Sequence, residues 1–357
     1  MRRKIQRRTL FSKKKSKTPN LASYGLGLAA FLVLIYGAIF FLPVVPAQSN
    51  VGDITAYKVK INPQSSLASI AGQLKEQGIA LPSYTFQFSA RVLLVGSKLK
   101  PGTYLLPTGA SLAKILLQIA RGDRIKESIA IIPGMTIWQV RDLVNSHPAL
   151  LHQTKSMGSK ELLQALHLNY PGDEGIFLPD TYIFDPDELD ITIYRRASQA
   201  MQKQLTQSWS QKEPNSPLKS PYQLLILASI VEKETGRSSD RGLVAAVFIN
   251  RLIKGMPLQT DPTVIYGIGP KFDGNIRKAD LRRDSPYNTY MHKGLPPTPI
   301  SMPSRDSIEA VITPASSNAL YFVAKGDGSS HFSKSLDEHE AAVDRYQRKI
   351  NAKTSSN

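Results

Sequence analysis

The chain has 357 residues, of which 41% are hydrophobic, and this is enough for two or three domains with hydrophobic cores. It contains no cysteine, which excludes a thiol nucleophile, a disulfide framework, a thiolate metal site and lipidation through cysteine. The formal net charge is +17, but nine of the basic residues lie in the first twenty, where no acidic residue occurs; about half of the excess therefore indicates membrane topology and not a nucleic-acid partner.

Residues 1–20 are predicted to form a basic cytoplasmic tail, and residues 21–45 a transmembrane anchor. An uninterrupted apolar run extends from Leu21 to Val45. A helix needs roughly 20 apolar residues to cross a bilayer, whereas the apolar region of a cleaved signal peptide has roughly 7–15. The run favours a permanent anchor, although Val45–Ala47 resembles a cleavage site. Because the basic flank stays in the cytoplasm, a single-pass protein of the cytoplasmic (inner) membrane is expected, with its main part periplasmic or extracytoplasmic.

Beyond the anchor, turn clusters and changes of composition predict an α+β fold in four parts. These are a strand–helix–helix–strand module, a second α+β subdomain with its connector, a mixed α/β domain that follows a proline cluster, and a frayed tail. Their predicted ranges are residues 51–125, 126–213, 214–350 and 351–357.

Within the module, alternating apolar residues around Val59 indicate a first strand, and Pro101–Leu105 indicates the second. Between them Ser65 or Ser66 caps one helix, and another helix follows Ser83. Three apolar residues are predicted to share one face of this second helix: Phe88, Val92 and Val95.

In the second subdomain, residues 129–132 are predicted to form a strand and Thr136 to begin a helix. From Glu174 to Asp187, turn-forming residues alternate with aromatic side chains, so an ordered connecting loop is expected there. A helix is expected from Ile191 to Trp209, ahead of the proline cluster.

The last domain begins with an apolar helix, and residues typical of helix ends mark both its start and its end. Ser220 and Gln223 form a capping box, and Pro221 suits the first helical position. Gly236 suits the left-handed residue after the end.

The only acidic residues of this helix, Glu232 and Glu234, lie in its final turn. At helical spacing Glu234 follows four strongly apolar residues: Val231, Ile230, Leu227 and Ile226. Glu232 follows a less strongly apolar set: Ser229, Ala228, Leu225 and Leu224. A carboxyl group held against hydrocarbon is expected to have a raised pKa, as a general acid requires, and Glu234 is the better candidate. The alternative is an acid that is solvated or paired with Lys233 or Arg237.

Several common catalytic patterns are absent or incomplete. The sequence has no His-Glu-x-x-His zinc motif and no phosphate-binding Gly-x-x-x-x-Gly-Lys loop. Ser111–Lys114 matches the Ser-x-x-Lys pattern, but Lys-Thr-Gly and Ser-Asp-Asn are both missing. His292, His331 and His339 lack the spacing of metal ligands, so they are interpreted as surface or packing residues, and no metal and no cofactor is predicted.

Six strings in the exported part are more specific: Ile230–Thr235, Val247–Leu252, Leu258–Gly267, Tyr287–Tyr290, Gly294–Pro297 and Tyr321–Ala324. Together and in this order they resemble the YceG-like family, the endolytic murein transglycosylases. The resemblance covers about the whole exported part of the chain.

Members of this family are bitopic membrane proteins in which LysM-like modules precede a lytic domain, and the strand–helix–helix–strand unit looks like such a module. The resemblance implies cleavage of peptidoglycan strands between N-acetylmuramic acid and N-acetylglucosamine, leaving 1,6-anhydro ends and terminating nascent strands near penicillin-binding synthases. It places the catalytic glutamate at the second Glu of the Glu-Lys-Glu-Thr string, which is Glu234.

Two polar strings are candidates for the substrate cleft, and they contain Gln259, Thr260, Asp261, Tyr287, Asn288 and Tyr290. Each assignment has a simpler alternative. Asp261 precedes Pro262 and suits a turn, the tyrosines suit a hydrophobic core, and Asn288 suits either a sugar acetamide or a turn.

Two other functions fit the same sequence. One is a noncatalytic scaffold that binds peptidoglycan and recruits synthases. The other is a muramidase-type hydrolase in which Asp261 activates water for Glu234.

Overall fold

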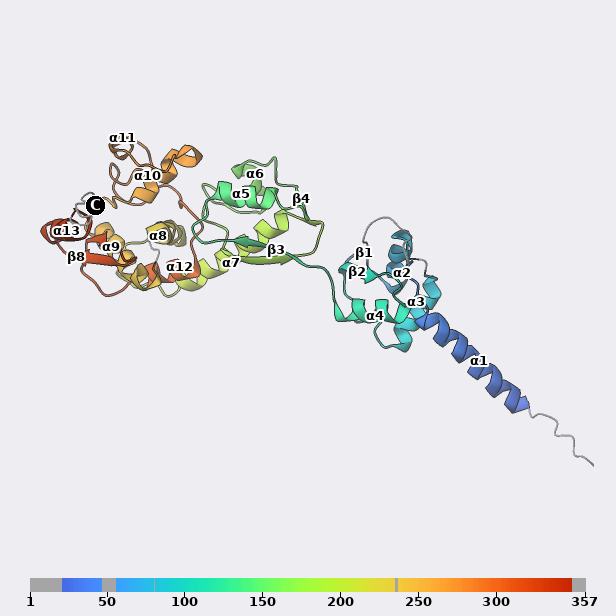
Figure 1. Cartoon of the computed structure of the whole chain (residues 1–357). Helices are drawn as coiled ribbons and strands as arrows, with labels where there is room; N and C mark the ends of the chain where they lie inside the picture. The colour runs from blue at the N-terminus through green and yellow to red at the C-terminus, as the bar shows by residue number, and fades with distance from the viewer. Residues whose placement is uncertain (1–20, 47–55, 80, 235–236, 349–357) are drawn as a thin grey trace, which may run out of the picture. The chain divides into compact units, whose positions relative to one another are not determined.

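The computed structural model describes residues 21–46, 56–79, 81–234 and 237–348 (Figure 1). The chain forms two compact units, Met1–Ile125 and Lys126–Asn357. The predictions for the basic tail, for Gly236 and for the frayed end lie outside the described residues.

In the described part of the first unit, one helix, α1 (Leu21–Phe41), is long and apolar enough by length and composition to cross a membrane. It is followed by the predicted order of strand, helix, helix and strand: β1 (Ala56–Ile61), α2 (Leu67–Glu76), α3 (Ser83–Val92) and β2 (Gly102–Pro107). The strands pair antiparallel, with Ala56 opposite Pro107, and α4 (Leu112–Arg121) closes a core built around Tyr104. Ser66 is the residue that caps α2, because its hydroxyl accepts a hydrogen bond from Ser69 N.

The predicted apolar face of α3 is not the face that packs inward. The buried residues of this helix are Thr85, Phe86, Ser89 and Ala90. Phe88 and Val92 keep 53% and 56% of their surface exposed, and Val95 lies beyond the end of the helix. The second apolar face of α3 is therefore open on the surface of the unit.

The second unit begins with β3 (Glu127–Ile131), which pairs antiparallel with β5 (Asp180–Phe184). The expectation of a connecting loop from Glu174 to Asp187 is wrong over β5, where Tyr182 and Phe184 turn inward while Thr181 and Ile183 stay exposed. Other elements of this part are α5 (Ile137–Asn145), α6 (Ser159–Ala165), α7 (Ile191–Trp209), and the short parallel pair β4 (Leu150–Leu151) and β6 (Glu188–Leu189).

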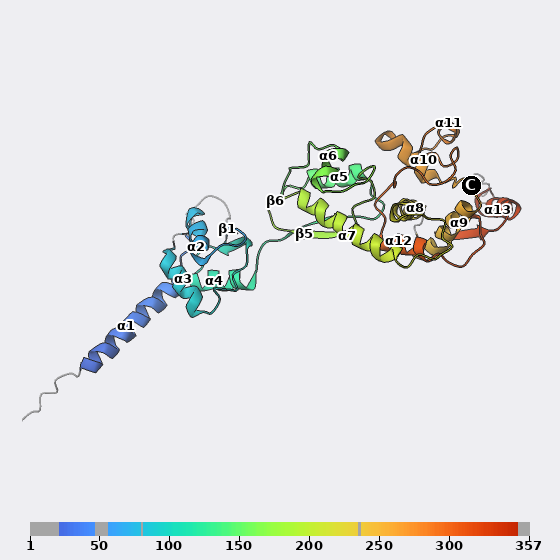
Figure 2. The ribbon, with the colours of Figure 1, turned by 180° about the vertical axis from the view of Figure 1, so that it is seen from behind.

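The rest of the second unit is built around α8 (Pro221–Glu234), which contacts α7, α9 (Arg241–Ile253), α10 (Asp261–Ile268) and α12 (Arg305–Ile312) (Figures 1 and 2). Every residue of α8 from Leu224 to Val231 is buried. One hydrophobic core runs from Ile129 through α8 to Ile312, and the predicted boundary near residue 214 falls inside this core.

Short elements complete the unit around this core. They are α11 (Lys278–Arg282), the antiparallel hairpin of β7 (Tyr321–Ala324) and β8 (Ser330–Ser333), and α13 (Leu336–Val343), with helical turns at Ser238–Asp240, Gly269–Lys271 and Asp344–Arg348.

A buried carboxyl group links the first part of this unit to α10. Glu174 is only 2% exposed and accepts hydrogen bonds from Ile137 N, at the start of α5, and from Gly175 N, at 2.9 and 3.2 Å. Burial raises the pKa of Glu174 from 4.5 to about 8, although these backbone donors and Tyr266 of α10 oppose the rise. Tyr266 in turn stacks on Trp138 of α5, with ring centroids 5.1 Å apart.

The raised pKa of Glu174 predicts a pH-dependent stability. Between pH 4.5 and about 8, the unfolded chain has lost the proton that the folded chain keeps. Raising the pH through this window therefore lowers the free energy of unfolding, by up to about 1.4 kcal/mol per pH unit. The Glu174→Gln variant should lose this slope. Urea unfolding monitored by the two tryptophans, Trp138 and Trp209, which both lie in the second unit, measures it.

The matched control is Glu340→Gln, which alters an exposed glutamate of α13. It should keep the wild-type slope. Parallel pH curves for wild type and Glu174→Gln would contradict the interpretation of Glu174.

Candidate active site

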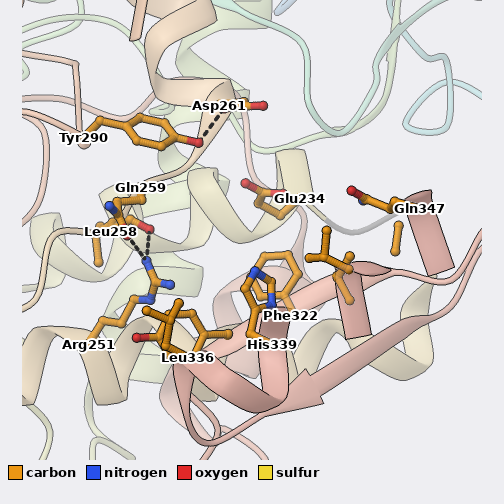
Figure 3. A pocket seen from close by; sticks show the side chains of 14 residues that line it. Glu234, Arg251, Leu258, Gln259, Asp261, Tyr290, Phe322, Leu336, His339 and Gln347 are labelled. Atoms are coloured by element: carbon orange, nitrogen blue, oxygen red, sulfur yellow. Dashed lines mark hydrogen bonds between the residues drawn. The ribbon is translucent and has the colours of Figure 1, made fainter. Parts of the chain in front are cut away.

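Glu234 is the last residue of α8, and its half-buried side chain lines a pocket of about 620 Å³ (Figure 3). The walls come from α9, from the segment before α10, from the β7–β8 hairpin and from α13. Figure 3 shows Glu234 between the pair Asp261 and Tyr290 on one side and Phe322 and His339 on the other. The rigid helix thus presents a carboxyl group to an open cavity.

Burial raises the pKa of the Glu234 carboxyl above its ordinary value. The Thr260 hydroxyl donates a hydrogen bond to Glu234 Oε1 and lowers this pKa, while the negative charge of Asp261 raises it. Lys233 is directed elsewhere, because its Nζ donates to Gly134 O at 3.3 Å. Among the residues that the structure describes, no cation forms an ion pair with Glu234. Burial and the charge of Asp261 thus favour the protonated form of this carboxyl group.

Glu232 has a different environment. Its Oε2 accepts hydrogen bonds from Ser304 N and Ser307 Oγ, at 2.8 and 2.7 Å, and from Ser304 Oγ. Ser304 caps α12, so Glu232 holds the start of that helix. The apolar-face comparison does not separate the two acids, because both faces of α8 are buried. Their hydrogen-bond partners do.

A cluster of buried threonines fixes the hydroxyl that contacts Glu234. Thr260 N donates to Thr289 Oγ1 at 3.1 Å, and Thr263 Oγ1 donates to Thr260 O at 2.8 Å. The hydroxyls of Thr263 and Thr289 are 2.9 Å apart. Thr263 had no role in the sequence interpretation, since nothing in its local pattern indicates that α10 and the loop at Thr289 converge beside Glu234.

Of the six predicted binding residues, Gln259, Asp261 and Tyr290 line the pocket. Tyr290 donates from its hydroxyl to Asp261 Oδ1 at 2.6 Å. Asp261 also begins α10 ahead of Pro262. Its backbone therefore fits the alternative of a turn-forming residue, whereas its side chain lines the pocket. Thr260 is buried beneath them, against Glu234.

The other two predicted residues, Tyr287 and Asn288, do not line this pocket. The Tyr287 hydroxyl is 2.8 Å from Thr298 Oγ1, and its ring lies against Tyr266. Asn288 is buried, and its amide nitrogen donates to three backbone carbonyls, those of Asp280, Leu281 and Arg283. Its side chain matches the alternative of a residue that satisfies backbone groups in a turn.

Arg251 is a pocket residue that the sequence interpretation missed, although it belongs to the string Val247–Leu252. It is buried, and it donates to Leu320 O at 2.7 Å and to Leu258 O at 2.9 Å. Its guanidinium lies 5.1 Å from the centre of the Tyr321 ring, on which His339 stacks. Burial and the charge of Arg251 lower the pKa of His339. His339 is thus a packing residue of the pocket wall.

Across the described ranges, no group of three or more histidine, aspartate or glutamate side chains is arranged to hold a metal ion.

Comparisons with known proteins agree with one another. The profile of the YceG-like family matches residues 59–345. A protein of Bacillus subtilis named endolytic murein transglycosylase is 32% identical over 325 residues, which cover 84% of this chain and 87% of that protein. A protein of the same name from Streptococcus pneumoniae serotype 2 is 28% identical over 314 residues, but this is 78% of the chain and only 56% of that longer protein.

A solved structure is similar as well. The crystal structure of a YceG-like protein from Listeria monocytogenes superimposes with a TM-score of 0.50 at 30% sequence identity. The match covers 80% of this chain and 98% of that one.

Two substitutions should move the pKa of Glu234 in opposite directions. Thr260→Val removes a hydrogen bond to the charged carboxylate and should raise the pKa; Asp261→Asn removes a neighbouring negative charge and should lower it. Carboxyl carbon NMR titration of glutamate-labelled protein measures both, and the signal is assigned by its loss in Glu234→Gln. Equal pKa values in the two variants would contradict the proposed electrostatics.

Proposed function

This chain belongs to the YceG-like family, and from that membership and the geometry around Glu234 we propose that it is an endolytic peptidoglycan lytic transglycosylase. Its substrate would be the glycosidic bond from N-acetylmuramic acid to N-acetylglucosamine within a strand, and the product a 1,6-anhydro end. The observation that carries the proposal is one carboxyl group with a raised pKa, bound by a neutral hydroxyl and lining a pocket.

Glu234 performs both proton transfers in this reaction. As an acid it gives its proton to the glycosidic oxygen, and the bond from that oxygen to muramic C1 breaks. As a carboxylate it then takes the proton of the muramic C6 hydroxyl while that oxygen bonds to C1. No water is consumed, and the enzyme returns to its protonated form. The C6 hydroxyl is already tethered to its target, so its effective concentration is high.

The surroundings of Glu234 support the two half-steps in turn. Burial and the charge of Asp261 keep the proton on the carboxyl group until the glycosidic oxygen takes it. The Thr260 hydroxyl then stabilises the carboxylate that remains. The negative charge of Asp261 on the same pocket wall favours the oxocarbenium-like transition state.

We further propose that α1 is a single-pass anchor in the cytoplasmic membrane, with the basic tail in the cytoplasm and both folded units outside it. The antiparallel β1 and β2 with α2 and α3 between them support a LysM-like assignment for the first unit, which would hold peptidoglycan strands. Strand termination beside penicillin-binding synthases follows from the family and is part of the proposal.

Glu234→Gln should reduce cleavage of purified glycan strands by about 10²–10⁴-fold, because the variant has no proton to transfer. Release of soluble fragments from strands, followed by chromatography, measures this loss. The variant should still sediment with peptidoglycan.

The control is Glu232→Gln, two residues away on the same helix. It should retain cleavage within about tenfold and instead lower the free energy of unfolding by about 1–2 kcal/mol, because Ser304 and Ser307 lose a charged acceptor. Full cleavage by Glu234→Gln would remove the catalytic assignment, and no cleavage by the wild type would favour the scaffold.

Asp261→Asn separates the lyase from the hydrolase. In a lyase, Asp261 acts only through its charge, so the variant should still cleave, at a reduced rate, and its products should still carry anhydro ends. In a hydrolase with Asp261 as the base, cleavage should fall by about 10²–10⁴-fold. Mass spectrometry distinguishes the products, since a hydrolysed end is one water heavier; reducing ends from the wild type would reject the lyase.

A further inference from the structure

The outward face of α3 is a continuous apolar stripe. Tyr84, Phe88 and Val92 lie four residues apart on one side of the helix, and Leu94 is the second residue after its end. Tyr84 and Leu94 are 77% and 79% exposed. Three large apolar side chains in one row, with an exposed leucine just beyond the helix, are more than the scattered surface residues of an ordinary domain.

The stripe is continuous with the apolar surface of α1. Tyr36 of α1 meets Phe88 edge to face, with ring centroids 5.1 Å apart, and its hydroxyl is 2.7 Å from Ser89 Oγ. Just after α1, the backbone N–H groups of Val44 and Val45 donate to Ala110 O. The end of α1 is thus fixed to the module, and the side chains of α3 have a defined height along α1.

With α1 across a membrane as proposed above, that height is the edge of the bilayer. The 21 residues of α1 span about 31 Å, close to the ~30 Å hydrocarbon core. Tyr36 lies about 8 Å before the end of α1 at 1.5 Å per residue. Interfacial helices insert their apolar face about 5–10 Å into the boundary between headgroups and acyl chains, which is the level of Phe88.

Leu94 adopts a backbone conformation that leucine rarely takes. Its φ of 55° is left-handed, and it occupies the position after the C-cap in a Schellman motif, with Leu94 N donating to Arg91 O and Val95 N to Ala90 O, both at 3.0 Å. At the same position after α2 the chain has Gly78, with φ 91°. Glycine suits this backbone, so Leu94→Gly would remove the exposed side chain without disturbing the turn.

The charge of the module suits the same surface. Residues 56–125 contain nine basic and two acidic residues. Within α3, Arg91 is exposed next to Val92, and no acidic residue occurs. Basic residues beside an apolar stripe are typical of helices that lie on anionic lipid headgroups.

We propose that Tyr84, Phe88, Val92 and Leu94 form a second membrane contact, which lays the first unit on the outer leaflet of the bilayer that α1 crosses. The proposal rests on the anchoring of α1 proposed above. With α1 and α3 both in contact with lipid, the unit cannot rotate freely about its anchor, so a strand that binds to it lies next to the membrane surface.

Spin labels on the full chain test this contact, and the absence of cysteine makes single-cysteine variants direct to prepare. The probe is a vesicle of phosphatidylglycerol and phosphatidylethanolamine. Labels at Tyr84→Cys and Leu94→Cys should be accessible to oxygen and protected from a water-soluble nickel chelate, as should a reference label at Leu32→Cys in α1. A label at Glu76→Cys, exposed on α2, should be accessible to the chelate.

The outcomes are distinguishable. Labels at 84 and 94 in water with the label at 32 in lipid would overturn the second contact and leave the anchor standing. A label at 32 in water would overturn the anchor and the contact together. Spin–spin broadening at 84 would show that a second copy of the chain covers the stripe, and this would also overturn the proposal.

A variant that keeps the fold gives a second test. Leu94→Gly suits the left-handed backbone, and Tyr84→Ser changes an exposed side chain, so neither should disturb the module. In this double variant a label at Val92→Cys should lose its protection from the chelate. Retained protection would count against the stripe as the source of the contact.

Discussion

The site depends on a helix that is buried on every side. From Leu224 to Val231 every residue of α8 is buried, and four helices contact it. Such a helix cannot tilt or rotate without opening the core, so the directions of the side chains in its last turn are fixed. Glu232 and Glu234 point about 160° apart around the axis. One therefore meets the start of α12, and the other meets the pocket.

The hydrogen-bond partners of these acids, and not their hydrophobic neighbours, distinguish their environments. A cation beside Glu234 would hold the carboxyl group ionised and unable to donate a proton. Glu234 instead contacts the neutral hydroxyl of Thr260, which can form a hydrogen bond with the carboxyl group in either protonation state. Hydrogen bonds with Thr263 and Thr289 hold Thr260 in place, so the hydroxyl beside Glu234 has a defined position.

Local signals in the sequence predicted much of the fold. Ser66 and Thr136 cap helices where expected, and α7 has the predicted bounds. Nonlocal contacts could not be predicted in this way. β5 was missed because its partner β3 lies about fifty residues earlier, and prolines flank it. Glu234 contacts Thr260, which lies 26 residues later in the sequence. From the sequence, Asn288 was a candidate for substrate binding, but its amide donates to three backbone carbonyls that only the structure identifies.

The open face of α3 shows a further limit of periodicity. A helical repeat of apolar residues indicates that a face avoids water, but a protein core and a lipid surface satisfy it equally. Exposure separates the two on α3. Tyr84, Phe88, Val92 and Leu94 keep 53–79% of their surface exposed, so a core of this unit does not cover them. Tyr36 joins α3 to α1, so a membrane crossed by α1, as proposed, would lie within reach of this face.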